Sequence, residues 1–382
     1  MKAWLTCLTL AISWTMVPLA RADAPRVPAP RALGAPSYIL TTYRSGQTLV
    51  AKHPDEEIAP ASFAKLMVSY IVFDAMRHGR LSPQTELTVS KKAWRTSGSR
   101  MFLKVGDKVS VNQLLHGLIT TAGNDAAVEL AQSIAGTTST FVIYMNRYAA
   151  RLDLGHTHFV NVTGLPASGQ YVSATDMARL YAALVHRFPR YYHRYFNQRV
   201  FTYDGIKQYN RNSLLWSDPR VDGGVTGYEQ SAGYHLAASA SADGMRVIAV
   251  VLGARSALAR KHECDALINY AFRYYRSGTV WPADRPIKSL RIWDGADDRL
   301  PVIARGAVNV AYPRGQRNAL VYQARLPARV MAPVHKGARL GQLRILYNDR
   351  LLREVPIYAG ATVKRGSFFG RAYDNVELLL GA

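Results

Sequence analysis

A helical pattern that begins at Ser62 constrains the fold of this 382-residue chain more than any other feature. Apolar residues recur there at intervals of three and four until His78-Gly79; they are Phe63, Leu66, Met67, Tyr70, Ile71 and Ala75. This period predicts a helix that ends near the glycine. Lys65 follows Ser62 by three residues, so the two side chains lie on one face of the helix within reach of each other.

A serine and a lysine at this spacing suit nucleophilic catalysis. The positive end of the helix favours a serine alkoxide. A lysine acts as a base only when its pKa falls from the usual value of about 10.4, and burial or a second cation lowers it. The pattern Ser-x-x-Lys is weak alone, because chance supplies about one in a chain of this length. Its meaning depends on the other motifs in the chain.

Two further segments later in the chain bear on this chemistry. Thr121-Ala122-Gly123-Asn124 interrupts a second helical stretch, residues 111–130, with a turn. Val225-Thr226-Gly227 precedes two strand-like runs, 236–240 and 247–252. Penicillin-binding proteins and class A β-lactamases carry Ser-x-x-Lys, then a Ser-x-Asn-type turn, then Lys-Thr-Gly. The three segments of this chain have that order.

The chain resembles the serine-type D-alanyl-D-alanine carboxypeptidases of the peptidase S11 family, which are low-molecular-mass penicillin-binding proteins. The motifs that carry the resemblance are Pro60-Ala-Ser-Phe-Ala-Lys65, Met101-Phe-Leu-Lys-Val-Gly-Asp107, Gly123-Asn-Asp-Ala126, Leu214-Leu-Trp216, Thr226-Gly227, Ala232-Gly-Tyr234 and Phe368-Phe-Gly-Arg371. The resemblance implies an α/β (α+β) fold of the penicillin-binding/β-lactamase-like transpeptidase type. A helical cluster would then lie on an antiparallel sheet, with the site at their junction and a small all-β domain after it.

The same resemblance implies the reaction and its two principal residues. Ser62 would attack the carbonyl between the last two D-alanines of a peptidoglycan stem peptide, and Lys65 would take its proton. An acyl-enzyme would form, and water would release it. Penicillins and other β-lactams would acylate Ser62 as mimics of the dipeptide. No metal or organic cofactor is implied, and His156 with His158 lacks a third ligand nearby.

The resemblance also implies substrate-binding residues. Asn124 would hold the substrate amide and help to position the proton path. Thr226 and Gly227 would lie on an edge strand that pairs with the substrate, and backbone N–H groups near the nucleophile would form an oxyanion site. Arg211 and Arg260 occupy positions where the family keeps arginines near the site.

Two positions depart from the family pattern. Ala122 stands where the second motif starts with serine, so a hydroxyl that can relay a proton to the leaving amine is missing. Val225 stands where the third motif starts with lysine, a cation that can bind the substrate carboxylate and keep Lys65 deprotonated. Arg260 is a candidate to replace the carboxylate contact. These changes leave open a catalytically impaired peptidoglycan- or penicillin-binding protein, while a β-lactamase fits less well because no deacylating carboxylate is recognisable.

The N-terminus predicts export. Lys2 precedes an apolar stretch, residues 3–19, and Ala20-Arg21-Ala22 offers a cleavage site, so residues 1–22 have the pattern of a signal peptide. The alternative is an uncleaved anchor. The proline-rich residues 23–33 predict an extended linker. We therefore expect a periplasmic protein of the bacterial envelope, and a peripheral contact with the inner membrane stays open.

The strong positive charge restricts the partners. Lys and Arg number 48 against 26 Asp and Glu, a formal net charge of +22. Such an excess favours anionic surroundings, and residues 187–195 interleave aromatic and basic side chains as a nucleic-acid binder does. Export argues against nucleic acid as a partner. The remaining interpretations of the charge are binding to an anionic cell wall, binding to a phospholipid surface, or a basic surface that has no specific ligand.

Length and pattern divide the chain. A length of 382 residues favours two domains. Beyond residues 281–286 the sequence shows little helical period until its last residues. We expect a catalytic domain over residues 34–283, a β-rich domain over 284–364 with a hairpin turn at Asn348-Asp349, and a short amphipathic tail over 365–382. The apolar stripe of the tail is typical either of an in-plane membrane anchor or of a terminal helix packed on its own domain.

Overall fold

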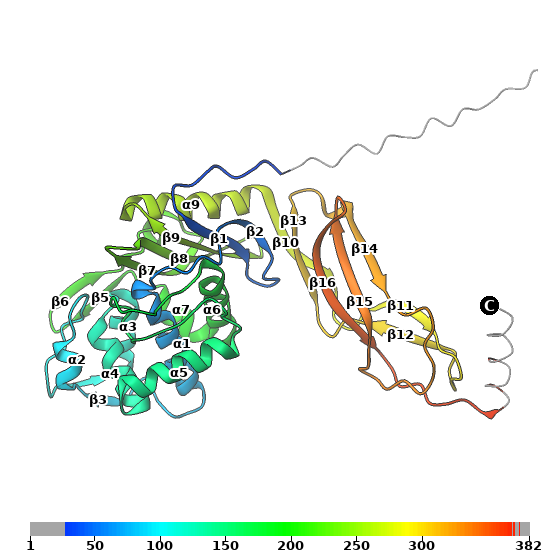
Figure 1. The fold of residues 1–382 in the computed structure, drawn as a ribbon, viewed down its shortest axis with the longest axis horizontal. Coiled ribbons are helices and arrows are strands. Elements are labelled where there is room, and N and C mark those ends of the chain that lie inside the picture. Colours follow the sequence, from blue (N-terminus) through cyan, green and yellow to red (C-terminus); the bar gives the residue numbers. More distant parts are fainter. Residues whose placement is uncertain (1–26, 369, 371–373, 375–382) are drawn as a thin grey trace, which may run out of the picture.

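The computed structural model describes residues 27–368, 370 and 374, which form two lobes (Figure 1). An antiparallel five-stranded sheet of order β2-β1-β9-β8-β7 is the centre of the first lobe. Its strands are β1 (Ser37–Thr42), β2 (Thr48–Lys52), β7 (Val221–Glu229), β8 (Gly233–Ala242) and β9 (Met245–Ala254). Strands β1 and β2 are consecutive and form an antiparallel hairpin at one edge of this sheet. Strand β7 ends the sheet on the side of the predicted motifs.

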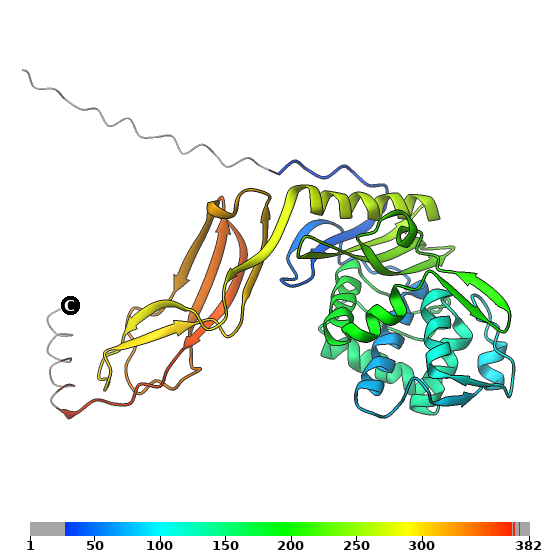
Figure 2. The same cartoon turned by 180° about the vertical axis from the view of Figure 1, so that it is seen from behind.

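Helices cover both faces of this sheet. The long helix α9 (Ala257–Tyr274) lies along one face, and a cluster of helices covers the other (Figure 2). The short helix α8 (Leu214–Ser217) lies on the α9 side, where Leu214 and Leu215 share a buried apolar cluster with α9. The cluster on the other face contains η1 (Ala61–Phe63), α1 (Ala64–Arg77), α2 (Lys91–Arg95), α3 (Val111–Thr120), α4 (Asn124–Ala135), α5 (Thr138–Arg151), α6 (Ala174–Arg187) and α7 (Pro189–Phe196). Two short ribbons border it: β3 (Glu86–Thr88) with β4 (Lys108–Ser110), and β5 (Val200–Tyr203) with β6 (Ile206–Tyr209).

The strand β9 shows why the sheet is buried on both sides. Its side chains alternate between faces, as the pleat of a strand requires. Ile248, Val250 and Leu252 pack into the core of the helical cluster, whereas the alternate residues Val247, Ala249 and Val251 pack against α9. A strand whose two faces are both buried has apolar residues at consecutive positions, which explains the continuous apolar sequence of residues 247–252.

The two predicted helical stretches are confirmed. The pattern that begins at Ser62 forms the turn η1 followed by α1, and only the last residue of α1, Arg77, is exposed. The second stretch is divided into α3 and α4 at the predicted turn. Ala122 in this connection has a φ of 55°, a left-handed conformation that is uncommon for a residue with a Cβ. The connection turns the chain sharply beside the start of α1.

The second lobe consists of strands. Helix α9 continues directly into β10 (Tyr275–Trp281), which pairs with β13 (Val308–Pro313). A second antiparallel sheet has the order β11-β12-β16-β15-β14. It contains β11 (Pro286–Arg291), β12 (Arg299–Ile303), β14 (Leu320–Arg325), β15 (Arg339–Tyr347) and β16 (Arg350–Ala359), and a short turn η2 (Arg317–Ala319) precedes β14. Asn348 and Asp349 both have positive φ in the turn between β15 and β16, so the predicted hairpin is confirmed.

The chain ends lie partly outside the described residues. The predicted signal peptide falls there entirely, and so does most of the apolar stripe of the tail. Asp374 is described, and its carboxylate accepts hydrogen bonds from the backbone N–H of Asp294 at 2.7 Å and from the guanidinium of Arg291 at 3.4 Å. Within the described residues, no helix is both long enough and apolar enough to cross a bilayer.

Candidate active site

The predicted motifs meet where the helical cluster joins the edge of the first sheet. A small cavity of about 10 Å³ marks this junction. It is lined by Ser62, Lys65, Ser69, Leu118, Ile119, Thr120, Ala122, Asn210, Val225 and Thr226. The fold thus brings five predicted site positions from three separate segments into one place: Ser62, Lys65, Ala122, Val225 and Thr226. Sequence analysis did not identify Ser69, Thr120 or Asn210.

Ser62 and Lys65 are paired in the geometry that the helix predicted. The Nζ of Lys65 lies 3.1 Å from the Oγ of Ser62 and donates to the carbonyl oxygen of Thr163 at 2.7 Å. Burial, and to a smaller extent the positive charge of Arg211, lower the pKa of Lys65 from 10.5 to about 7, while the charge of Asp125 opposes both effects. Near neutral pH a large fraction of the lysine is therefore an uncharged amine that can accept the serine proton.

A tight loop presents the carbonyl that binds Lys65. The side chain of Asn161 accepts hydrogen bonds from the N–H of Thr163 at 3.1 Å and from the N–H of Gly164 at 2.7 Å. Gly164 has a φ of 76°, and a Cβ there would lie 1.5 Å from the carbonyl oxygen of Ala61. The loop thus lies directly against the residue before the nucleophile. Sequence analysis missed this contact, because a backbone acceptor leaves no residue signature.

The segment before Ser62 is also attached to the sheet. His235 on β8 donates from Nε2 to the carbonyl oxygen of Ala59 at 3.0 Å and accepts at Nδ1 from the N–H of Gly253 at 3.0 Å. Burial lowers the pKa of His235 to about 4, so the ring is neutral at physiological pH. Its ring packs edge-on against Phe63. A lone histidine in a strand gave no sequence signal for this role.

The start of α4 holds a second loop beside the site. The buried carboxylate of Asp125 accepts hydrogen bonds from the backbone N–H groups of Met101, Phe102 and Leu103. The side-chain amide of the predicted site residue Asn124 donates to the carbonyl oxygen of Ser97 at 2.7 Å. Asn124 does not line the small cavity. The bonds made by Asp125 and Asn124 hold residues 97–103 against the start of α4.

The two predicted arginines lie near β7 and have different surroundings. Arg260 is buried, and it donates to the carbonyl oxygens of Gly227 at 3.1 Å and Arg211 at 3.3 Å. Burial, with help from the charge of Arg211, lowers the pKa of Arg260 to about 10, so it remains a cation. The side chain of Arg211 is exposed. Neither arginine lines the small cavity.

The edge strand lies close to the nucleophile. A Cβ placed on Gly227 would be 3.3 Å from the backbone nitrogen of Ser62, so this glycine lets β7 approach η1. Val225, Thr226 and Gly227 pair on one side with β8, and β7 is the last strand of the sheet among the described residues. An extended peptide can bind such an edge by strand addition.

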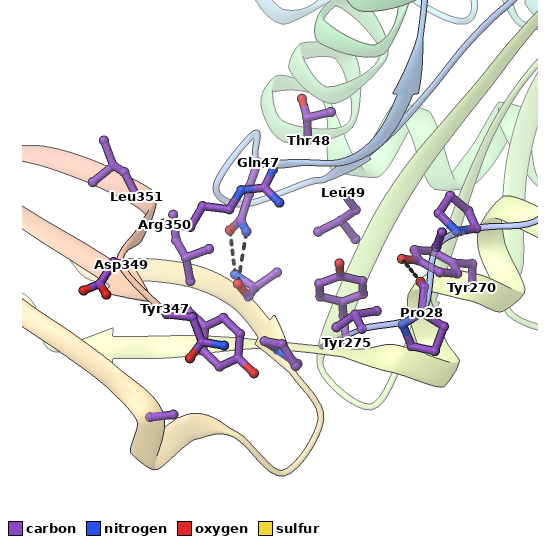
Figure 3. Close-up of a pocket in the computed structure, with 18 of the residues that line it drawn as sticks. Pro28, Gln47, Thr48, Leu49, Tyr270, Tyr275, Tyr347, Asp349, Arg350 and Leu351 are labelled. Carbon is purple, nitrogen blue, oxygen red and sulfur yellow. Dashed lines mark hydrogen bonds between the residues drawn. The ribbon is translucent and has the colours of Figure 1, made fainter. Parts of the chain in front are cut away.

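A much larger cavity lies elsewhere. It has a volume of about 1020 Å³ and lies at the junction of the lobes, where its lining includes Gln47, Tyr270, Tyr275 and Arg350 (Figure 3). The side chain of Gln47 exchanges two hydrogen bonds with the backbone of Ala311 there, at 3.1 and 3.0 Å. None of the predicted site residues lines this cavity. Size therefore does not identify the reactive site, and the placement of Ser62 and Lys65 does.

Comparison with known proteins agrees with this geometry. A family model described as D-alanyl-D-alanine carboxypeptidase, Peptidase S11, matches residues 23–256. The chain belongs to this family. A second model, the C-terminal domain of penicillin-binding protein 5, matches residues 275–365, which include the strands of the second lobe.

Individual S11 relatives cover nearly the whole chain. The carboxypeptidase DacC of Escherichia coli strain K12 is 38% identical over 376 residues, which are 96% of this chain and 94% of the relative. DacD of Salmonella typhimurium is 36% identical over 92% of each chain. The crystal structure of penicillin-binding protein 5 from Haemophilus influenzae matches with a TM-score of 0.85 and 32% identity, covering 88% of this chain and 99% of that one. The expected penicillin-binding fold with a second all-β domain is thus confirmed.

Proposed function

We propose that this protein is a serine-type D-alanyl-D-alanine carboxypeptidase in which Ser62 is the nucleophile and Lys65 its base. The family and its relatives carry this activity in their names. One observation supports the residue assignment above the others: the buried amine of Lys65 lies 3.1 Å from the Ser62 hydroxyl, and its pKa is about 7. A base with a pKa near the working pH is effective for proton transfer.

The reaction begins when the amine of Lys65 takes the proton of Ser62. The serine oxygen attacks the carbonyl carbon between the last two D-alanines of the stem peptide, and a tetrahedral intermediate forms. The backbone N–H groups at Ser62 and on the facing part of β7 are placed to stabilise its oxyanion. Collapse expels the terminal D-alanine and leaves an ester on Ser62, which water hydrolyses. A β-lactam opens on the same serine.

The edge strand and its neighbours orient the peptide. Thr226 and Gly227 offer backbone groups on the unpaired side of β7, and Asn124 holds the amide of the substrate from the opposite side. We assign the terminal carboxylate to Arg211, because its side chain is exposed and its charge reaches Lys65. Arg260 supports this contact by binding the backbone carbonyl of Arg211.

The altered motif positions do not favour the impaired alternative. Val225 removes a lysine that would keep Lys65 deprotonated, but burial and Arg211 already lower the pKa of Lys65. Ala122 removes a hydroxyl from the second motif. Relatives at 30–38% identity over most of the chain are named as D-alanyl-D-alanine carboxypeptidases. The active enzyme therefore explains the site best.

The cellular setting follows from the termini and the charge. Residues 1–22 would direct export and be removed, residues 23–33 would link the mature N-terminus to a catalytic domain over 34–283, and a β-rich domain over 284–364 would follow. The substrate places the protein in the periplasm. The tail, residues 365–382, with the net charge of +22, supports a peripheral contact with the inner membrane.

The test uses the mature chain, residues 23–382, with Ser62→Ala as its control. Each protein is incubated with a labelled penicillin and with a peptide that ends in D-Ala-D-Ala. We expect label on the wild type and release of D-alanine, with both lost in the variant. Label without D-alanine release would instead support the impaired penicillin-binding protein, and the absence of both would contradict the enzyme.

A further inference from the structure

The small cavity beside Ser62 has the size of one water molecule. Its volume of about 10 Å³ is the lower limit for holding a single water. Ala122 contributes to its wall with a methyl group only, so this wall provides no hydroxyl at that position. A buried water also requires two to four polar partners. Whether this site can hold a water therefore depends on the polar side chains that line it.

Thr120 is the first polar partner. Its side chain lines the cavity and is 1% exposed. The hydroxyl of Thr120 has no hydrogen-bond partner among the described residues. The neighbouring hydroxyl of Thr121, by contrast, donates to the carbonyl oxygen of Gly117 at 2.7 Å. Native proteins rarely leave a buried hydroxyl unpaired, because its desolvation costs about 1–3 kcal/mol.

Lys65 is the second polar partner. A protonated lysine carries three N–H groups, and two of them are directed to Ser62 and to the carbonyl oxygen of Thr163. The remaining N–H belongs to a side chain that lines the same cavity. The hydroxyl of Ser69 also lines it, and this hydroxyl can accept a bond because its own proton goes to the carbonyl oxygen of Lys65 at 2.8 Å. The cavity therefore has enough polar groups for one water.

We propose that one water molecule, held between the Thr120 hydroxyl and the Lys65 amine, passes the proton to the leaving amine in place of the hydroxyl that Ala122 lacks. This inference rests on the proposed function. Thr120 is then a positioning residue, since it acts on the substrate through the water. The serine hydroxyl missing at Ala122 would thus be replaced by the Thr120 hydroxyl, two residues earlier, together with one water molecule.

The proton balance of the step is complete. Lys65 becomes an ammonium when it takes the proton of Ser62 and the new carbon–oxygen bond forms. On collapse of the intermediate, the bond between the carbonyl carbon and the nitrogen of the terminal D-alanine breaks. That nitrogen takes a proton from the water while the water takes one from the Lys65 ammonium. The lysine returns to an amine, the water is regenerated, and Ser62 remains as an ester.

The test compares four variants of the mature chain with the wild type. Thr120→Val removes the hydroxyl at nearly constant shape, and Thr120→Ser retains it. Ala122→Ser is made in the Thr120→Val background to return a hydroxyl to the cavity from a second lining position. Thr121→Val removes a hydroxyl of equal burial that does not line the cavity. We measure the rate of acylation by a penicillin, the release of D-alanine, and thermal unfolding for each protein.

We expect Thr120→Val to slow both acylation and D-alanine release by about 100-fold, the lower end of the range for the loss of a proton-transfer group. The Thr120→Ser variant and the double variant should have rates within about threefold of the wild type. The control variant Thr121→Val should keep the wild-type rates, and any effect of this substitution should be limited to its melting temperature. A purely structural role for Thr120 would not be rescued by a serine at position 122.

A high-resolution crystal structure of the wild type provides a readout that does not depend on activity. We expect an ordered water in the cavity within hydrogen-bond distance of the Thr120 Oγ1. A dry cavity, an unaffected Thr120→Val variant, or a double variant without recovery would each overturn the inference. If the wild type releases no D-alanine, the proposed function fails, and the crystallographic water together with penicillin acylation still decides the role of Thr120.

Discussion

Burial and a neighbouring positive charge both lower the pKa of the Lys65 amine. The surrounding helices remove the ammonium from water, and Arg211 repels it, so its pKa falls to about 7. The sequence allowed us to predict the pairing of Ser62 with Lys65 from their spacing alone. It did not show which cation replaces the lysine missing at Val225, because Arg211 is far away along the chain and only the fold brings it near.

The effect of the Arg211 charge on Lys65 leads to a prediction about the pH dependence of acylation. Arg211→Met removes the repulsion, so the pKa of Lys65 rises and less amine is present at low pH. We expect the acidic limb of the penicillin acylation profile to move to higher pH, with a larger loss of rate at pH 6 than at pH 9. The control is Arg190→Met, which removes an exposed arginine of α7. An unchanged profile for Arg211→Met would show that burial alone sets the pKa.

Among the elements, the loop at residues 161–164 and the strand β8 determine where the nucleophile lies. The loop presents the Thr163 carbonyl to Lys65, and His235 on β8 holds the carbonyl of Ala59. The sequence predicted η1 with α1, the division of α3 from α4, and the hairpin at Asn348-Asp349, since these features depend on local period and turn residues. It missed the loop and the histidine, because both act through backbone groups that are distant in the chain.

The loop provides a matched pair of glycine variants. Gly164 and Gly169 both have positive φ, 76° and 81°, so alanine at either position costs about 1–2 kcal/mol of backbone strain. Only at Gly164 would the new Cβ meet the carbonyl oxygen of Ala61. We expect Gly164→Ala to lower the free energy of unfolding by about 2–4 kcal/mol and to slow acylation strongly. Gly169→Ala should retain the acylation rate, and equal effects of the two variants would contradict the close approach.

Over the whole molecule, one lobe carries the reactive groups and the other is built from strands. The junction is fixed by the direct passage of α9 into β10 (Figure 1) and by the hydrogen bonds between Gln47 and Ala311 (Figure 3). The chain length and the loss of helical period near residues 281–286 allowed two domains to be predicted from the sequence. The junction cavity of about 1020 Å³ had no signal in the sequence, since it is formed by segments from both lobes.

The buried His235 connects the stability of the first lobe to pH. Its pKa is about 4 in the folded state, below its ordinary value of 6.5, so the unfolded state binds more protons between these values. The stabilisation is therefore complete above pH 6.5 and is lost as the pH falls toward 4, by roughly 3 kcal/mol. Urea unfolding at pH 7, 5.5 and 4 measures this change. His235→Gln should remove that part of the pH dependence, whereas the exposed His193→Gln should retain it.

The most direct test of the central claim is to locate the acyl group. The mature wild type is treated with a penicillin, digested, and mapped by mass spectrometry. We predict that one penicillin is added per chain, on the peptide that contains Ser62, and that Ser62→Ala carries none. An adduct on another residue, or D-alanine release by Ser62→Ala, would contradict the assignment of Ser62 as the nucleophile.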